Sequence, residues 1–530
     1  MGKDFNWSIP ENYNFVDVLR RWAEDKSKLS VIVEHVDGRV EKATYWEILD
    51  NAARLGNVFR SLGVYKGDRV LILLPRGIEA YVARFGTWII GGVAVPGTVM
   101  LRRWDIEYRI RDCEPKVIVV GDPVTASEVD AIRDKISLKH FIIVGEDRRG
   151  WINFWDVIRS ASRKIELEEI KANDVLTINY TSGTTGPPKG VVRTHDWMYC
   201  ILKIHAEYWW RNVKPSDLCW VTAEPGWAKW EYAVLGVVFN VGATNFHYTG
   251  RFNPEIWFNL LDKWRINIAK MTATELRAMC TVSDADRKYD LSSLKFILSA
   301  GEPVTPKIVK FFKEMFGVDV REGYGQTETC ITACVPPDTK IKPGSMGKFV
   351  PMVDAAIVNP ETGLPVGVGE VGVIAIKKGH PTIFKGYWGR HEEKCYIGEW
   401  YLTGDMAKMD EDGYIWFEGR SDDVIKSSGY RIGPFEVENI INSHPAVLES
   451  AVVASPDPLR GAIVKAYVVL KPGYKPSEEL IRDIQDYCKK IAAPYKYPRE
   501  IEFIDELPKT ISGKIKRFEL RKRELEKKSK

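Results

Sequence analysis

Short, continuous apolar runs with longer helix-like stretches between them are the feature that most constrains this fold. The first three are followed directly by Pro or Gly, and two more repeat the pattern. The five runs are Val70–Leu74, Val117–Val120, Phe141–Val144, Leu176–Tyr180 and Phe296–Ser299. Such runs are typical of strands buried on both faces of a sheet. Strands that alternate with helices predict α/β layers with mostly parallel sheets.

The texture of the sequence changes near residue 345, where Gly and Pro become frequent. The alternating run Val371–Ile376 then predicts a small antiparallel or barrel-like unit. After Arg420 the pattern indicates a compact α+β segment. One face of an amphipathic helix in that segment is marked by Leu480, Ile484, Cys488 and Ile491.

The predicted fold class is therefore α/β with two domains. A large N-terminal domain, residues 1–421, holds two α/β layers and the barrel-like subdomain. A small, mobile α+β lid follows as residues 422–530. We expect its last seventeen residues, from Lys514 on, to form a charged, solvated tail.

Composition excludes several classes of protein. The chain is 45% hydrophobic and 28% charged, as in globular proteins rather than disordered ones. A net charge of +4 argues against a nucleic-acid partner. No apolar run reaches about 18 residues and no signal peptide is recognisable, so we expect a cytoplasmic protein without membrane insertion. The eight scattered cysteines indicate reduced core thiols rather than a metal site.

A loop rich in Gly, Ser and Thr follows the predicted strand at 176–180. Its glycines let the backbone approach a ligand closely. Four hydroxyls and one lysine add donors and a positive charge, which suits a polyphosphate. The alternative is a flexible connection, and the loop does not fit the Walker pattern. The segment reads Tyr180-Thr181-Ser182-Gly183-Thr184-Thr185-Gly186-Pro187-Pro188-Lys189-Gly190.

A second glycine pattern, at residues 367–372, formally matches the dinucleotide fingerprint G-x-G-x-x-G. That fingerprint must follow a strand and open a helix. Here it follows a turn-like Thr-Gly-Leu-Pro and precedes an alternating strand, so we interpret its glycines as turn residues.

Together with the loop, five further motifs resemble those of the adenylate-forming (AMP-binding) superfamily, and they occur in the same order. The superfamily includes acyl-CoA synthetases, luciferases and peptide-synthetase adenylation domains. Medium-chain enzymes of the acetyl-CoA synthetase type are the most similar. The motifs are Ser299–Pro303, Tyr324–Glu328, Tyr401–Asp405, Gly419–Lys426 with Ser428–Arg431, and Pro508–Ile515.

This resemblance implies a two-step reaction with ATP, Mg²⁺ and coenzyme A. A carboxylate attacks the α-phosphorus of ATP to give an acyl-adenylate, and a thiol then displaces AMP. Glu328 is expected to ligate Mg²⁺, and Thr184 and Lys514 to act with it in catalysis. The β- and γ-phosphates are expected to bind Thr181, Ser182, Gly183, Thr185, Gly186 and Lys189.

The resemblance also implies where the nucleoside binds. Asp405 is expected to accept hydrogen bonds from the ribose, and Arg420 and Arg431 to lie beside the phosphates. Taken singly, each would more simply form a surface ion pair. The adenine wall is expected to comprise Gly301, Glu302, Pro303, Glu322, Gly323, Tyr324, Gly325, Gln326 and Thr327.

By the same resemblance, the lid changes position between the two half-reactions. Asp422 is the expected hinge. Lys514 would bridge carboxylate and α-phosphate during adenylation and then withdraw. Ser428 and Gly429 would approach the pantetheine, where glycine allows close contact. Without the motif, Lys514 would be one more solvated lysine.

The partners expected are a small carboxylic acid, ATP and free coenzyme A, because little chain follows Lys514. A luciferase-like or carrier-loading enzyme, or a catalytically degenerate ATP-binding scaffold, remains the alternative. Acetate-specific members place Trp where this chain has Gly325, so we expect a larger acid. Trp227 is the candidate pocket wall, and Lys229 faces either a polar acyl tail or solvent. The oligomeric state stays open, a homodimer included.

Overall fold

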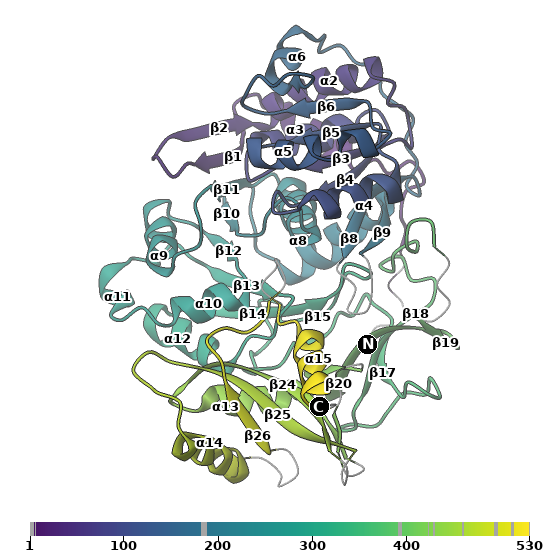
Figure 1. The fold of residues 1–530 in the computed structure, drawn as a ribbon. Helices are drawn as coiled ribbons and strands as arrows, with labels where there is room; N and C mark the ends of the chain where they lie inside the picture. Colours follow the sequence, from purple (N-terminus) through teal and green to yellow (C-terminus); the bar gives the residue numbers. More distant parts are fainter. Residues whose placement is uncertain are drawn as a thin grey trace. The chain divides into compact units, whose positions relative to one another are not determined.

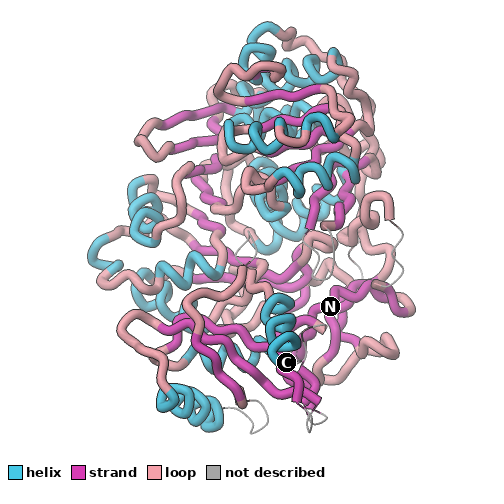
Figure 2. The backbone as a smooth tube through the Cα atoms, viewed as in Figure 1, coloured by secondary structure: helices cyan, strands magenta, loops and turns pink. Residues whose placement is uncertain are grey.

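The computed structural model describes most of the chain, in two units. The described residues are 5, 7–181, 188–390, 395–421, 423, 425–427, 430–457, 461–491, 497–509 and 514–528. Unit 1 comprises residues 1–343, 350–353 and 379–393, and unit 2 comprises 344–349, 354–378 and 394–530. Figures 1 and 2 show the elements of each unit.

Unit 1 contains two sheets, and the first is parallel except at one edge. Its order is β7-β6-β5-β3-β4-β8-β9, and only β8 and β9 pair antiparallel. The strands are β3 (Arg69–Leu73), β4 (Val93–Gly97), β5 (Val117–Val120), β6 (His140–Ile143), β7 (Ile152–Asn153), β8 (Val175–Thr181) and β9 (Lys189–Thr194).

The second sheet of unit 1 is parallel at its centre. Within the unit its order is β15-β14-β13-β12-β10-β11-β1-β2, with antiparallel pairing at β14–β15 and β1–β2. The strands are β1 (Leu29–Glu34), β2 (Val40–Thr44), β10 (Leu218–Val221), β11 (Thr244–Tyr248), β12 (Ile268–Lys270), β13 (Phe296–Ala300), β14 (Asp319–Gly325) and β15 (Ile331–Cys334). All five runs predicted as buried strands are strands of these two sheets.

Helices cover both sheets, as Figure 1 shows for α2 to α6 around β3–β6. Two helices, one begun by α7 and one by α8, continue as π-helices η2 and η3, in which residues bond five positions along instead of four. The helices of unit 1 are α1 (Val16–Ala23), α2 (Tyr45–Ser61), α3 (Ile78–Trp88), α4 (Arg103–Cys113), α5 (Pro123–Asp130), η1 (Arg133–Lys135), α6 (Phe154–Ser160), α7 (His195–Ile201), η2 (Leu202–Trp209), α8 (Ala228–Trp230), η3 (Glu231–Phe239), α9 (Pro254–Lys263), α10 (Ala273–Met279), α11 (Ala285–Lys288) and α12 (Pro306–Phe316).

Local sequence explains where these elements begin and lie. Strand β3 is buried on both faces: Leu71 and Leu73 pack with α4 and α5, while Val70 and Ile72 are equally buried. Helix α2 begins at a reciprocal cap in which the Thr44 side chain accepts from the backbone of Glu47. The predicted parallel α/β architecture is confirmed.

Unit 2 has an antiparallel sheet followed by an α+β segment. The first sheet runs β17-β18-β20-β19, with β21 paired to β20; a hairpin, β22–β23, and a sheet ordered β24-β25-β26 follow. The strands are β16 (Lys348–Phe349), β17 (Ala355–Val358), β18 (Gly372–Lys377), β19 (Tyr396–Ile397), β20 (Trp400–Met409), β21 (Ile415–Arg420), β22 (Ile425–Ser427), β23 (Tyr430–Ile432), β24 (Val447–Asp457), β25 (Gly461–Leu470) and β26 (Glu500–Phe503). Residues 367–371 are turn and coil before β18, as expected for turn glycines.

The helices of unit 2 are α13 (Pro434–Ser443), α14 (Glu478–Ile491) and α15 (Arg517–Lys528). The predicted amphipathic helix is α14, whose Ile484 and Cys488 enter the core while Leu480 packs against it. The prediction of a solvated tail after Lys514 is wrong. Residues 517–528 form α15, with Leu520 fully buried in a second core and Glu524 bonded to Ser455 and Lys465 at 2.8 Å each.

Contacts group residues 354–378 with the C-terminal segment, whereas the sequence places a domain boundary at 421/422. Contact density does not measure which part of a chain rotates, so the boundary at Asp422 stays a prediction. No helix in the described parts of the chain is long and apolar enough to cross a membrane.

Candidate active site

The segments of unit 1 that the sequence predicts for the acyl pocket and the nucleotide lie at the carboxyl ends of neighbouring parallel strands. The strands β10, β12, β13 and β14 lie side by side in that order. Residues 224–230 follow β10, residues 301–303 follow β13, and 326–328 follow β14. The crevice outside the carboxyl ends of strands is where open α/β sheets bind ligands.

The turn after β13 is shaped by Gly301, Glu302 and Pro303. Gly301 has a φ of +94°, and a Cβ there would stand 2.8 Å from the Lys229 Nζ. Lys229 also donates to the Ala300 carbonyl at 3.4 Å. Glu302 accepts a 2.8 Å hydrogen bond from Thr274. Lys229, for which the sequence allowed contact with either a polar acyl tail or solvent, therefore lies against this motif.

Glu322, on β14, braces that turn from below. Its carboxyl accepts a 2.9 Å hydrogen bond from the backbone of Val304, and burial raises its pKa to about 8. A group held in this way positions the turn of residues 301–304. The contacts of the Glu322 side chain thus hold the segment that the sequence predicts as an adenine wall, through the backbone of Val304.

Two glycines of β14 are required by close packing. A Cβ on Gly323 would stand 2.6 Å from the Trp209 ring, and a Cβ on Gly325 would stand 2.2 Å from the Cys330 carbonyl oxygen. The side-chain direction at Gly325 is thus filled by the protein's own backbone. The close approach of the Cys330 backbone is therefore a structural reason for glycine at position 325, separate from the pocket space predicted from the sequence. Tyr324, between them, is buried.

The turn at Gln326, Thr327 and Glu328 is held by a buried arginine that the sequence did not reveal. The Gln326 backbone donates to Thr329 Oγ1 at 3.1 Å. Arg193, on β9, donates to the Thr327 and Thr329 carbonyls and stacks on Trp197. Its place on the strand directly after the phosphate loop was the available signal.

The predicted phosphate loop connects two antiparallel strands. Thr181 ends β8 and Lys189 begins β9, and they are partners in the ladder. The loop between them is thereby fixed at both ends. Ser182, Gly183, Thr184, Thr185 and Gly186 lie outside the described residues. Tyr108 of α4 donates to the Pro188 carbonyl at 2.8 Å and so anchors the loop's exit.

Lys189 and Glu328, distant in sequence, meet around Tyr387. The Lys189 Nζ lies 4.9 Å from the centre of the Tyr387 ring. The Tyr387 hydroxyl donates to Glu328 Oε1 at 2.9 Å. Tyr387 is not among the residues predicted from the sequence, where its only signal is the aromatic-glycine run Gly386-Tyr387-Trp388-Gly389.

The loop after β10 sits tightly on β4. A Cβ on Gly226 would stand 2.2 Å from the Thr98 nitrogen. Arg84, fully buried, donates to the Pro225 carbonyl, and its guanidinium lies 4.5 Å from the Trp230 ring centre. Trp227 is half-buried at the start of α8. Its backbone is therefore fixed while part of its indole stays accessible, as a pocket wall requires.

In unit 2 the structure brings Asp405 and Arg420 together. They are opposite each other on β20 and β21, and the guanidinium donates to Asp405 Oδ1 at 3.1 Å. Gly404 has a φ of +74°, and a Cβ there would stand 3.1 Å from the same guanidinium. Asp405 is buried, whereas the Arg420 side chain is 36% exposed, so the ion pair is only partly sheltered from solvent.

The remaining predicted residues are only partly described. Lys514 is exposed. The backbone of Arg431 lies on β23, opposite Lys426. The hinge residue Asp422 and the pantetheine residues Ser428 and Gly429 lie outside the described residues.

The donor set fits Mg²⁺ held mainly by substrate. Within the described ranges, no group of three His, Cys, Asp or Glu side chains is placed to hold a metal ion. Mg²⁺ typically takes one or two carboxylates together with substrate phosphates. The Glu328 carboxylate, fixed at one oxygen by Tyr387, suits that role. All eight cysteines are free thiols.

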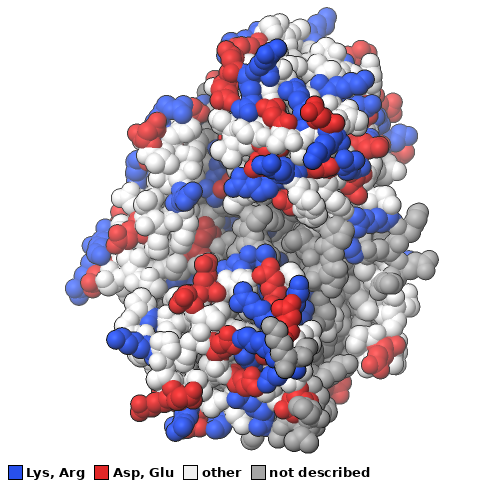
Figure 3. Space-filling model, viewed as in Figure 1, with Lys and Arg blue, Asp and Glu red and all other residues white. Residues whose placement is uncertain are grey.

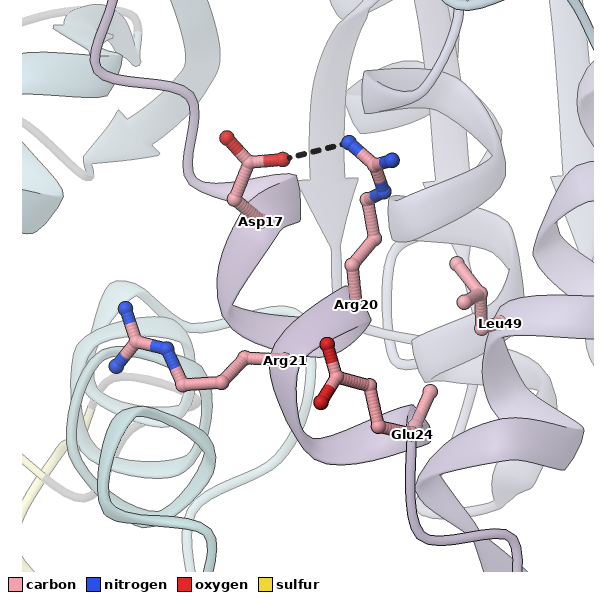
Figure 4. A pocket seen from close by; sticks show the side chains of 6 residues that line it. Asp17, Arg20, Arg21, Glu24 and Leu49 are labelled. Atoms are coloured by element: carbon pink, nitrogen blue, oxygen red, sulfur yellow. Dashed lines mark hydrogen bonds and ion pairs between the residues drawn. The ribbon is translucent and has the colours of Figure 1, made fainter.

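A separate hollow of about 590 Å³ lies between α1 and α2, away from these segments. Figure 4 shows Asp17 paired with Arg20 at 3.0 Å, beside Arg21, Glu24 and Leu49. Both residues of the pair are about half exposed, and no predicted site residue lines the hollow. On the face in Figure 3, basic and acidic side chains are interspersed over the described surface of each unit.

Comparison with known proteins places these segments in a family. The profile described as "AMP-binding enzyme" matches residues 19–388, and that described as "AMP-binding enzyme C-terminal domain" matches residues 436–514. The two matches together cover most of the chain.

Relatives match over nearly their whole length. An uncharacterized acyl–CoA ligase of Bacillus subtilis is 43% identical, over 97% of this chain and 97% of that protein. The human mitochondrial acyl-coenzyme A synthetase ACSM3 is 40% identical, over 99% and 92%. The crystal structure of the anthranilate CoA ligase AuaEII in complex with anthranoyl-AMP has a TM-score of 0.90 and 31% identity, over 99% and 100%.

Proposed function

The chain belongs to the AMP-binding enzyme family, and from that premise we propose which step each part of its site serves. It is an AMP-forming acid–thiol ligase: ATP, a carboxylic acid and coenzyme A give acyl-CoA, AMP and diphosphate through an acyl-adenylate. Its fold class was predicted from the alternation of strands and helices, and its family and its substrates ATP, a carboxylic acid and coenzyme A from the resemblance of the motifs.

In the first half-reaction a carboxylate oxygen bonds to the α-phosphorus of ATP, and the bond to diphosphate breaks. Negative charge builds on the phosphates, so fixed cations and donors lower the barrier. We assign Lys189 and the loop from Thr181 to Gly186 to the departing diphosphate. Glu328 holds the Mg²⁺ that accompanies it, oriented by Tyr387. Lys514 bridges the attacking carboxylate and the α-phosphate.

We assign two sets of the residues described above to the nucleoside, one to adenine and one to the ribose. The turn at Gly301, Glu302 and Pro303, braced by Glu322, and the strand from Gly323 to Thr327 bind adenine. Asp405 accepts from the ribose hydroxyls, and its ion pair with Arg420 keeps the carboxylate oriented. Arg431 assists at the phosphates.

In the second half-reaction the sulfur of coenzyme A bonds to the acyl carbonyl carbon, and AMP departs with the bonding electrons of the mixed anhydride. We assign Asp422 to the hinge that exchanges Lys514 for the segment of Ser428 and Gly429. Replacing Asp422 with proline, which fixes φ, should reduce overall turnover while leaving Lys514 in place. Unchanged turnover would remove the hinge assignment.

The acid is larger than acetate. The support is Trp227, which is half-buried at the start of α8, beside the β10 strand end. Gly325 adds nothing to it, because a Cβ there would point at the Cys330 carbonyl oxygen rather than into a pocket. The relative AuaEII is named for anthranilate, an acid with an aromatic ring. Medium-chain, branched and aromatic acids are the classes to test.

One observation carries the assignment: Tyr387 joins Lys189, at the mouth of the phosphate loop, to the carboxylate of Glu328. The test is acid-dependent exchange of radiolabelled diphosphate into ATP, screened over linear C2–C10, branched and aromatic acids. We expect exchange with at least one acid larger than acetate, and CoA-dependent release of AMP with the same acid. No exchange with any acid would make the chain a nucleotide-binding scaffold.

We also propose a cytoplasmic location, supported by the eight cysteines, none of which lies in a disulfide, as is usual for proteins of a reducing compartment. Fractionation of the native host, followed by immunoblotting, checks it.

A further inference from the structure

Lys270, the last residue of β12, is a buried cation for which neither half-reaction gives a role. It is 4% exposed, and no described residue hydrogen-bonds its Nζ. Its neighbours Ala269 and Met271 enter the core beneath the sheet, so Lys270 faces the opposite side, toward η2 and η3. A buried ammonium without an acceptor is costly and calls for a physical reason.

Three aromatic rings enclose that ammonium. The Nζ lies 4.2 Å from the ring centre of Tyr232, 4.9 Å from Trp209 and 5.8 Å from Trp210. We call Lys270 with these three rings the aromatic box. Trp209 and Trp210 come from η2 and its end, and Tyr232 comes from η3.

The rings alone do not offset the cost of burying the charge. Each aromatic face stabilises the ammonium, but a ring provides no lone-pair acceptor for its N–H groups, and an unpaired buried charge is costly. The pKa of Lys270 is accordingly lowered by burial and then by the nearby positive charge of Lys229. Both charged and neutral forms of the amine retain N–H donors that need an acceptor.

The indole N–H groups of Trp209 and Trp210 are in the same position. Both are buried, and no described residue accepts from either. The aromatic box thus contains three unsatisfied donor groups, one amine and two indole N–H groups, and, among the described residues, no acceptor for them. Oxygen atoms of a ligand would satisfy all three.

The aromatic box adjoins the site at the strand ends. Lys270 pairs with Leu298 of β13, two residues before Ala300, whose carbonyl accepts from Lys229. Trp209 lies directly against Gly323, with ring atoms 2.6–2.8 Å from where its Cβ would be. The box therefore lies between the two segments assigned to adenine and the segment of Trp227 assigned to the acyl group.

We propose that Lys270 and the aromatic box recognise an oxygen acceptor on the tail of the acid, so that the preferred substrate carries a hydroxyl, a carbonyl or a second carboxylate. This inference rests on the proposed acyl-CoA synthetase function. It narrows the substrate class from acids larger than acetate to oxygen-bearing ones.

The test compares acids that differ only in the tail. The probes are hexanoate, 6-hydroxyhexanoate and adipate, and, as a second set, benzoate and 4-hydroxybenzoate. For each, kcat/KM of diphosphate exchange is measured with the wild-type protein. We expect at least one oxygen-bearing acid to exceed its plain partner by about tenfold or more, since an unpaired buried donor disfavours the plain acid.

Lys270→Met keeps the length and volume of the side chain and removes the donors. We expect kcat/KM for the oxygen-bearing acid to fall by on the order of 10- to 100-fold, the range for a hydrogen bond to a charged group, while the plain acid changes far less. The matched control is Lys263→Met, whose Nζ lies 5.7 Å from the Trp264 ring but pairs with Glu34. It should leave the ratio between acids unchanged.

The outcomes separate the two proposals. A wild-type protein that prefers the plain acid in both sets, or a Lys270→Met variant with an unchanged ratio, overturns the role of the box and leaves the synthetase function standing. Absence of exchange with every acid defeats both. If melting shows that Lys270→Met does not fold, Trp210→Phe, which keeps a ring and loses the N–H, must lower the ratio in the same direction.

Discussion

The entrance of the predicted phosphate loop and the aromatic box each contain a lysine, but in opposite surroundings. At the loop, Lys189 is partly exposed, and the nearby carboxylate of Glu328 is fixed by Tyr387. In the box, Lys270 is fully enclosed, with aromatic faces and no described acceptor. A lysine that meets a phosphate present in every turnover can stay solvated. A lysine that meets the variable tail of the acid gains selectivity from the exclusion of water, because an acid tail without an oxygen leaves the lysine's donors unpaired.

This difference divides variants into two classes. Changes at the nucleotide residues should slow every acid by the same factor, since ATP is common to all. Changes in the box should alter the ratio between acids. The predictions below test that division, beginning with the largest effect.

Lys514→Ala should give the largest loss. We expect acyl-adenylate formation to slow by on the order of 100- to 1,000-fold, as for loss of one transition-state donor. The fall should be equal for plain and oxygen-bearing acids. Formation of thioester from supplied acyl-adenylate should be spared. Single-turnover assays of each half-reaction measure this, and an equal loss in both would remove Lys514 from the adenylation step.

Glu328→Gln should also slow all acids alike, by on the order of 100-fold, because a neutral amide is a poorer magnesium ligand. Raising Mg²⁺ should restore part of the rate. Tyr387→Phe keeps the ring beside Lys189 and removes one hydrogen bond, so its loss should be about tenfold. Titration of Mg²⁺ at saturating ATP decides: an unchanged requirement in Glu328→Gln would place the metal elsewhere.

Glu322→Gln should change stability with pH rather than specificity. Burial raises the folded pKa of Glu322 to about 8, from an ordinary 4.5. Between those values the folded chain keeps a proton that the unfolded chain has lost, so the free energy of unfolding falls as pH rises. Gln does not ionise. The variant should therefore match the wild type near pH 4.5 and exceed it by on the order of 5 kcal/mol near pH 9, since each unit of pKa shift corresponds to about 1.4 kcal/mol. Urea unfolding at several pH values measures this; parallel curves would mean that Glu322 ionises freely.

Arg20→Ala, in the hollow between α1 and α2, should have the smallest effect. Its pair with Asp17 is about half exposed, and such pairs contribute about 0.5 kcal/mol or less. Neither rate nor ratio should move. A measurable change in acid preference would mean that specificity reaches beyond the box.

The sequence predicted most of what is local. Five buried strands, the helix of Ile484 and Cys488, and each single motif all follow from patterns within short stretches of chain, and the order of the motifs then identified the family. The structure then brought together pairs such as Asp405 and Arg420, on adjacent strands, which the motifs had assigned to one ligand. Family comparison confirmed the activity that these motifs imply.

What could not be predicted depends on distant packing. Tyr387 and Arg193 act through partners more than fifty residues away, and no spacing rule connects them. In the sequence, Lys270 cannot be told from an ordinary surface lysine, because its burial results from the packing of η2 and η3 against β12. The solvated tail was wrong for the same reason: one apolar residue, Leu520, and one buried carboxylate, Glu524, outweigh the charges around them. Three of the eighteen tryptophans now have a proposed role: Trp227 in the pocket wall, and Trp209 and Trp210 in the aromatic box.

Because the proposed aromatic box is built on the π-helical turns of η2 and η3, a change of one residue in the length of η2 would change which acids the box accepts. Each turn carries more residues than an α-helical one, so deleting a single residue within 202–209 would let that stretch relax to an α-helix without moving its ends far. Trp209 and Trp210 would then rotate out of register with Lys270. In a lineage of such enzymes, the gain or loss of one codon in η2 would therefore shift the substrate range. Substitution at Gly325 could not do so, because a side chain there would collide with the backbone of Cys330.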